Sequence, residues 1–217
     1  NYYTNEEITI PLDPTQTPGE NAQRYFAKYN KQKRTFEALT ELIRETADDI
    51  QYLESISNAL DIALSEADLA QIKEELMLSG YIRRKHTKKK VKLTSKPMHY
   101  ISSDGYDMYV GKNNLQNEEL TFSFANGNDW WFHAKGAPGS HVIVKSGGDE
   151  LPDQTFEEAG RLAAYYSKNR GADKVEIDYI QKKHVKKPNG AKPGFVVYYT
   201  NYSLTIHPDI SGLTLLS

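Results

Sequence analysis

The spacing of the apolar residues divides this chain at Gly80. Between Phe36 and Leu60 these residues recur every three or four positions, which is the heptad pattern of an amphipathic helix. A shorter run of helical spacing follows Ser65, and Gly80 is the expected end of that second helix. Beyond Gly80, short runs rich in β-branched and aromatic residues alternate with turn residues. The sequence therefore predicts helices first and a strand-rich part second.

Both predicted helices carry start signals. Thr17-Pro18-Gly19-Glu20 places a hydroxyl before the first turn, proline at its first position and glutamate at its third. Ser65-Glu66-Ala67-Asp68 announces the second helix with a hydroxyl and an acid in the same positions. One narrow apolar stripe leaves most of each helix in water, so we expect an antiparallel two-helix coiled-coil arm. An ordinary helical hairpin in a small bundle is the alternative.

Charge changes sign at the same place. Residues 1–80 carry 7 Lys and Arg against 15 Asp and Glu, whereas residues 81–217 carry 20 against 14. The net charge of −2 is thus the sum of an acidic half and a basic half. A basic half favours a polyanionic partner, and the two halves are best interpreted separately.

The second half predicts a mostly antiparallel sheet domain with one packed helix, which makes the fold class α+β. Thr155 is the predicted cap of that helix, and Glu158 is the acidic partner in its capping box. Asp104-Gly105 and Pro188-Asn189-Gly190 are turn signals. The predicted strands are Met98–Ile101, Tyr106–Val110, Leu120–Ala125, Trp130–Ala134, His141–Lys145, Val175–Ile180, Gly194–Thr200 and Leu204–His207.

Composition excludes several classes of protein. The chain has no cysteine and therefore no disulfide scaffold or zinc-finger site, and no apolar run approaches the roughly 20 residues that insert into a membrane. It opens at Asn1 without a secretory signal pattern, so we expect a cytoplasmic piece of a longer protein. It contains no phosphate-binding glycine loop, no closely paired histidines and no nucleophile motif. We expect no enzyme, no cofactor and no metal.

Two lysine-rich segments are the positive signal of function. The first holds seven Lys and Arg between residues 83 and 92, and it predicts an unpacked junction between arm and sheet domain. The second occupies residues 182–192, around a predicted hairpin tip where exposed cations can reach phosphates. The alternative is a pair of solvated loops kept soluble by lysine. The residues predicted to contact RNA in these segments are Arg83, Arg84, Lys88, Lys89, Lys90, Lys182, Lys183, Lys186, Lys187 and Lys192.

The second half contains a series of motifs at Ser103–Asn114, Asp129–Lys135, Pro138–Val142, Ala163–Ser167 and Val185–Gly194. Taken in this order, they resemble the RNA-binding C-terminal domain of the NFACT family. Upstream, Leu12–Pro14 and Glu20–Phe26 resemble the entry to the middle coiled coil of that family. The resemblance covers nearly the whole chain, and joined motifs in one order are more specific than any single motif. It implies an entry segment at 1–18, a coiled-coil arm with its basic junction at 19–95, and an RNA-binding domain at 96–217.

The resemblance implies a partner and an activity. Bacterial members include the ribosome quality-control factor that binds obstructed large ribosomal subunits and recruits tRNA for alanine tailing of stalled chains. The expected partners are therefore the large subunit, rRNA and tRNA, with tailing left to the full-length protein. Older naming in the family leaves a surface adhesin that binds fibronectin as an alternative, with secondary surface display. A purely structural or dimerising arm is a third reading, motivated by the heptad stripe.

Some residues of the family motifs have no assigned role. In one reading, Lys135, Ser140 and His141 surround a glycine turn and offer N–H groups to a phosphate. In the other, Gly136 and Gly139 only shape a hairpin, and His133 forms a hydrogen bond in the core. Lys112 joins Lys135 as a predicted RNA contact. The remaining motif residues of open role are Asp104, Gly105 and Trp131.

Overall fold

The capping signals of both helices form as predicted. In the computed structural model, which describes residues 1–83 and 95–217, helix α1 runs from Pro18 to Ile62. The Thr17 amide donates to the Glu20 carboxylate at 2.7 Å, and the Glu20 amide donates to the Thr17 hydroxyl at 3.3 Å. Helix α2 (Glu66–Leu78) begins with the reciprocal pair of Ser65 and Asp68. Gly80, at a φ of +81°, lies just past its end, as the sequence predicts.

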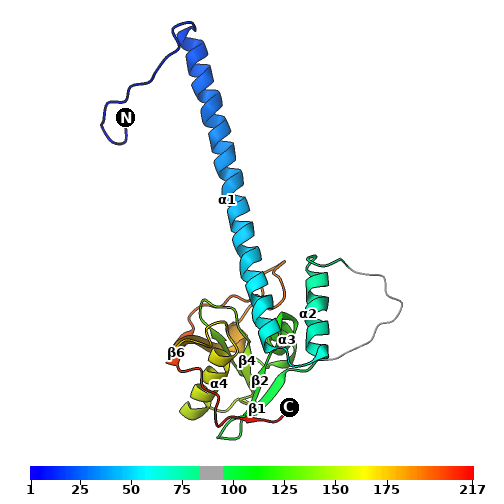
Figure 1. Cartoon of the computed structure of the whole chain (residues 1–217). Coiled ribbons are helices and arrows are strands. Elements are labelled where there is room, and N and C mark those ends of the chain that lie inside the picture. Colours follow the sequence, from blue (N-terminus) through cyan, green and yellow to red (C-terminus); the bar gives the residue numbers. More distant parts are fainter. Residues whose placement is uncertain (84–94) are drawn as a thin grey trace. The chain divides into compact units, whose positions relative to one another are not determined.

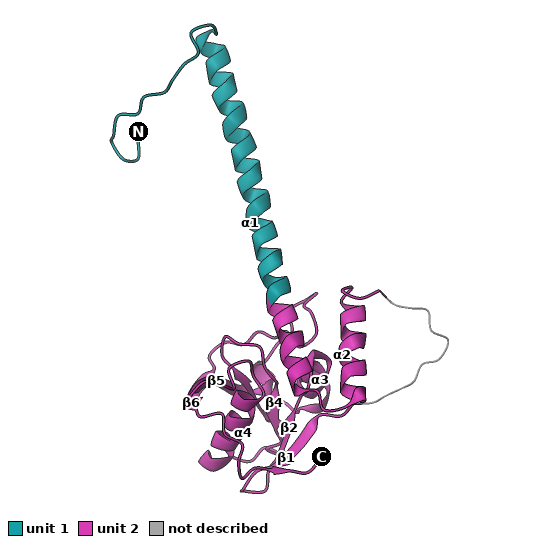
Figure 2. Ribbon diagram, in the orientation of Figure 1, with its two compact units in different colours: residues 1–50 teal, residues 51–217 magenta. Residues whose placement is uncertain are grey.

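The chain forms two compact units, residues 1–50 and 51–217, which Figure 2 colours separately. In the first unit, the buried Asn21 fixes the entry segment, because its amide group both accepts from the Asp13 amide at 2.8 Å and donates to the Asp13 carbonyl at 3.0 Å. The heptad stripe in this unit is open to solvent: Phe36 is 72% exposed and Ile43 is 68% exposed.

In the second unit, α2 packs against the final turns of α1. Tyr52, Ile56, Ala59 and Ile72 are buried together in one apolar cluster. Short apolar contacts of this kind hold two helices together without a long coiled coil. The helical pairing within this unit therefore involves α2 and the end of α1.

The sheet has seven strands, and every strand pair is antiparallel, which confirms the α+β fold class (Figure 1). Its order is β6-β5-β3-β4-β2-β1-β7. Helix α4 (Asp153–Tyr165) packs on one face. A short helix, α3 (Asn114–Glu119), runs into a π-helical turn, η1 (Leu120–Phe124). The strands are β1 Met98–Ile101, β2 Asp107–Val110, β3 Trp130–Ala134, β4 Val142–Val144, β5 Val175–Gln181, β6 Tyr202–Ile206 and β7 Thr214–Leu215.

The two faces of the sheet carry separate cores. Phe132 and Ile177 face α4, in a cluster that also contains Leu162 of that helix. Trp131, the next residue along β3, faces the other way and packs with Ile143 and Ile180. Alternation along a strand produces this division, because successive side chains point to opposite faces. Each face can therefore support a different surface.

Three predictions about the elements are wrong. Residues 120–125 form no strand: residues 120–124 form η1, and the apolar Leu120 and Phe122 pack on the Trp131 face from that helical turn. Residues 194–200 form no strand. The Gly194 amide donates to the Glu118 carboxylate at 3.3 Å instead of to a neighbouring strand. A carboxylate thus satisfies a backbone group that the sequence assigned to a ladder.

The third wrong prediction concerns the start of α4. Pro152 occupies the cap position, so the helix begins before Thr155. The Thr155 side chain is buried, and its hydroxyl donates to the Asp104 carboxylate at 2.7 Å. Glu158 accepts from the Ser103 amide at 2.8 Å and closes no capping box. Both polar side chains therefore tie α4 to the β1–β2 turn.

Candidate nucleic-acid interface

The lysine-rich segment after β5 has an ordered backbone. It opens with a 3-10 turn, η2 (Lys182–His184), whose Lys183 amide donates to the Gly127 carbonyl at 3.0 Å. Further on, Lys186 and Val197 exchange two backbone hydrogen bonds of 2.9 and 2.8 Å. Val185 is buried with Trp131 beneath the segment. The segment therefore covers the sheet face opposite α4.

Three lysines of this segment are available to a ligand. Lys183 and Lys186 are exposed, and no carboxylate of the described residues forms an ion pair with either of them. Lys182 is half-buried, with its ammonium 5.9 Å from the centre of the Phe122 ring. Mobile exposed cations on a fixed backbone suit phosphate binding. We call Lys182, Lys183 and Lys186 the lysine face.

Two other predicted contacts form ion pairs with carboxylates. Lys187 donates to both oxygens of Glu118 at 2.7 Å. Lys135 pairs with Glu176 on the neighbouring strand. The side chains of the Lys135–Glu176 pair are about half exposed, and those of the Lys187–Glu118 pair are about one third exposed. Ion pairs that water reaches in this way contribute little to stability. Because exposed pairs exchange readily with solvent, both lysines are partly neutralised rather than removed from the surface.

Lys112 has a structural role. Its ammonium is 3.0 Å from the Asp68 carboxylate, and the two side chains are only 15% and 1% exposed. Burial raises the pKa of Asp68, but hydrogen bonds from Ser95 and Lys112 outweigh burial and lower that pKa to about 2. Lys112 thereby holds α2 to the sheet and is not positioned to bind phosphate.

Lys192 lies over two tyrosines. Its ammonium is 4.5 Å from the Tyr52 ring centre and 5.1 Å from the Tyr81 ring centre, and it donates to the Tyr81 hydroxyl at 2.8 Å. The two rings stack 5.6 Å apart. A cation over two ring faces is held by their quadrupoles, so Lys192 ties the segment to the helices.

The basic junction is only partly described. Arg83 is exposed at its start. Arg84, Lys88, Lys89 and Lys90 lie outside the described residues, so their predicted contacts stay predictions.

The histidine motifs belong to the core rather than to a phosphate cradle. His133 and His141 meet across β3 and β4, with ring centres 5.4 Å apart, and Trp131 stacks on His133. The Ser140 amide donates to the Tyr166 carbonyl at 2.9 Å, and the His141 amide donates to the Asn117 side chain at 2.9 Å. Those N–H groups are thus occupied, which favours the structural reading of the motif.

The pKa values of both histidines agree with that reading. Burial lowers the pKa of His133 to about 4 and holds the pKa of His141 well below its ordinary value. Both rings are therefore neutral at pH 7 and offer no positive charge to a phosphate. Position 139 leaves little space for a side chain, because a Cβ there would lie 3.0 Å from the Ser167 side chain.

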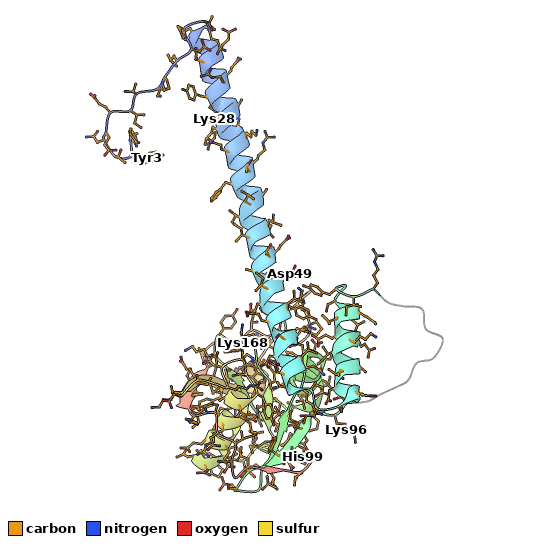
Figure 3. The ribbon with its side chains drawn as sticks, viewed as in Figure 1. Tyr3, Lys28, Asp49, Lys96, His99 and Lys168 are labelled. Carbon is orange, nitrogen blue, oxygen red and sulfur yellow. The ribbon has the colours of Figure 1, made fainter. Side chains whose placement is uncertain are left out.

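Sequence reasoning missed isolated basic residues. Figure 3 labels Lys96, His99 and Lys168, which all belong to the second unit. Lys96 is exposed just before β1, whereas Lys168 pairs with Glu54 at 2.5 Å. Only clustering marks a lysine in a sequence, so a single exposed one gives no signal.

The described residues give no sign of a metal centre or a membrane span. Within residues 1–83 and 95–217, no group of three or more His, Asp or Glu side chains could hold an ion. No helix of that part of the chain is long and apolar enough to cross a bilayer.

Comparisons with known proteins place both parts of the chain. Residues 1–95 match the model of the NFACT N-terminal and middle domains, and residues 96–200 match that of the NFACT protein RNA binding domain. The Rqc2 homolog RqcH of Streptococcus pneumoniae is 47% identical over 96% of this chain, and that of Bacillus subtilis is 44% identical over 96%. The match spans only 38% and 37% of those two proteins.

A solved structure is also similar. It is the C-terminal part of the fibronectin/fibrinogen-binding protein from Streptococcus suis, with 44% sequence identity and a TM-score of 0.80. The match covers 90% of this chain and 78% of that one.

Proposed function

The chain belongs to the NFACT family, and from this membership we propose that its lysine face docks ribosomal RNA or tRNA for a ribosome quality-control factor. The family model identifies residues 96–200 as an RNA-binding domain. The observation that supports the finer proposal is the lysine face itself: Lys182, Lys183 and Lys186 lie on one ordered segment without carboxylate partners among the described residues.

Electrostatics explains why such a face suits RNA. Each phosphate that a lysine neutralises releases a condensed counterion, so affinity depends steeply on salt. The aromatic residues packed beneath the segment fix its backbone and leave the ammonium groups in water. The chain then acts by binding, and peptide-bond formation belongs to the ribosome. Alanine tailing requires the longer protein, since the chain spans about two fifths of its curated relatives.

Co-sedimentation with large ribosomal subunits across a salt series tests the proposal. The logarithm of the association constant should fall linearly with the logarithm of the salt concentration, by roughly 0.7 to 0.9 per neutralised phosphate. Replacing Lys182, Lys183 and Lys186 with alanine should lower affinity and reduce the slope by about 2 to 3. Thermal unfolding should change little, because Lys183 and Lys186 are exposed and Lys182 is only half-buried.

A matched control removes the same charge elsewhere. Lys73, Arg170 and Lys174 are exposed, without ion pairs among the described residues, and their joint replacement by alanine should leave the slope unchanged. An equal loss in both triple variants would show only a general charge effect. Binding that ignores salt would remove phosphate contact from the proposal.

Fibronectin binding stays a prediction. The name of the Streptococcus suis protein concerns that protein alone. Our proposal places the protein on cytoplasmic ribosomes. Cell fractionation separates the two, because an adhesin would be found mainly at the surface.

A further inference from the structure

A second candidate surface lies on the opposite face of the sheet. There, the ends of β3, β5 and β6 meet the start of α4 around a cavity of about 430 Å³. Figure 2 labels α4, β5 and β6 at this end of the sheet. The lysine face lies on the Trp131 side, whereas the cavity opens on the Phe132 side, because Trp130 and Tyr179 share the α4 core.

Four aromatic rings line the cavity. Trp130 contacts Phe156 edge to face, with ring centres 4.8 Å apart. Tyr179 stacks with Tyr202 at 5.5 Å and lies 5.3 Å from Phe156. Tyr202 is 60% exposed on the edge strand β6, so the cluster is open to solvent on that side. The face of an aromatic ring carries negative quadrupole charge and therefore attracts a cation.

Three carboxylates stand at the rim. Asp149, Glu150 and Asp153 line the cavity and are exposed. None of the three forms an ion pair with a cation of the described residues. Asp153 lies close enough to act on the Tyr179 hydroxyl: burial first, and then the charges of Tyr202 and Asp153, raise the pKa of Tyr179. The described residues therefore leave the negative charge at the rim of this aromatic cavity without a balancing cation.

We propose that this cavity binds a lysine or arginine side chain carried by an extended basic segment of a partner protein. The cation would lie over the rings of Trp130 and Tyr202, within reach of the rim carboxylates. Cation–π attraction and ion pairing then act on the same group, and each strengthens as the group leaves water. The cavity volume suits one long side chain rather than a folded domain.

Charge decides between a protein and an RNA ligand. Bases stack on exposed aromatic rings, but every base brings a phosphate with it. Three carboxylates that have no cationic partner among the described residues repel that phosphate, whereas they attract an ammonium or guanidinium group. The proposal stands apart from RNA docking, since it uses the other face of the sheet and the opposite charge.

Fluorescence anisotropy with a labelled peptide tests the site on the whole chain. The probe is a seven-residue glycine peptide with two arginines, and its partner probe carries citrulline, the neutral isostere, in their place. In about 150 mM salt, where charges are screened beyond about 8 Å, the arginine peptide should bind at least about tenfold tighter than the citrulline peptide. Equal binding of the two peptides overturns the proposal.

Two variants locate the binding. Changing Asp149→Asn, Glu150→Gln and Asp153→Asn together should weaken the arginine peptide about tenfold. Tyr202→Leu keeps an apolar side chain but removes the ring, and it should weaken the peptide about twofold to fivefold. Circular dichroism is the measurement that checks whether both variants fold.

The matched control neutralises three other exposed acids. Asp61→Asn, Glu74→Gln and Glu119→Gln change the net charge by the same amount without touching the cavity. This control should bind the arginine peptide as the parent chain does. An equal loss in the control would overturn the proposal, because the acidic helices rather than the cavity would then hold the peptide. So would a Tyr202→Leu variant that loses affinity only for labelled oligouridylate, which would make the site an RNA platform.

Discussion

Asp68 shows at the scale of one residue how the helices are joined to the sheet. Its carboxylate accepts from the amides of Leu64 and Ser65 at 3.0 Å, and from Ser95 and Lys112. The pKa of about 2 lies below the ordinary value of 3.8, so the folded state holds the ionised form more firmly than the unfolded chain does. This stability is fully present above about pH 4 and is lost as pH falls toward 2.

Asp68→Asn should therefore lower the free energy of unfolding by about 2 kcal/mol at neutral pH. The difference between parent and variant should shrink as the pH falls through the acid range. Urea denaturation at a series of pH values measures both. A difference that stays constant with pH would mean that the lost hydrogen bonds, not the charge, account for the effect.

Glu75 behaves in the opposite way. It is fully buried, and one of its oxygens accepts from Tyr52 at 2.9 Å and from Asn114 at 2.8 Å. The second oxygen has no hydrogen-bond partner among the described residues. Burial raises the pKa of Glu75 above its ordinary value of 4.5, although the hydrogen bonds from Asn114 and Tyr52 oppose the shift. The folded state therefore prefers the protonated form.

The contribution of Glu75 to stability is fully present below about pH 4.5 and is lost as the pH rises through its folded value. Glu75→Gln removes this titration. The variant should gain stability relative to the parent chain between acid and neutral pH, and thermal unfolding at the two values measures the gain. Parallel pH profiles for the two proteins would show that the pKa of this carboxyl is the same in the folded and unfolded states.

At the scale of elements, the junction of β2 and α3 depends on one glycine. A Cβ on Gly111 would lie 2.2 Å from the Asn117 side-chain oxygen and 3.0 Å from the Asn117 backbone nitrogen. That oxygen also accepts from the His141 amide, and Ser140 donates to the Gly111 carbonyl at 2.5 Å. The close approach brings the start of α3 against the β3–β4 turn.

Gly111→Ala should destabilise the protein by about 1 to 3 kcal/mol, because neither backbone can move without breaking these bonds. Gly171→Ala is the control, since nothing lies within 4 Å of its Cβ position and its φ is not positive. It should be neutral or slightly stabilising. Equal midpoints in thermal unfolding would show that α3 shifts freely.

Sequence periodicity located most elements because their apolar pattern is simple. β1 and β3 have the predicted bounds, since alternation and turn residues fix both ends. Residues 120–125 misled because Leu120, Phe122 and Phe124 alternate like a strand but pack from a helical turn. Clustering alone marked the lysine-rich segment at residues 182–192 as a candidate interface, and its contact with RNA stays a prediction. The pairing of Lys187 with Glu118 could not be predicted in this way, because the two residues lie far apart in sequence and only the fold brings them together.

At the scale of the whole second unit, the sheet separates two charged surfaces. The lysine face and the aromatic cavity lie on opposite sides of one layer of strands. Sites that share no partners usually have additive effects. A variant that combines the three lysine changes with the three rim changes should lose as much affinity for ribosomes as the lysine variant alone. It should lose as much affinity for the peptide as the rim variant alone.

Peptide binding and ribosome binding, measured on the combined variant, check this additivity. A loss in one assay that depends on changes at the other face would show that the two sites communicate through the sheet. Independence would let the domain hold RNA and a basic protein segment at once.

The Glu118 carboxylate has a consequence for how the lysine-rich segment meets its ligand. It contacts the segment twice, through the Lys187 side chain and through the Gly194 amide. The Lys186–Val197 bridge closes the loop that contains both residues. A strip of chain that is already immobile loses little disorder when it is captured. Little of the free energy gained from each lysine–phosphate contact is therefore lost to ordering the backbone.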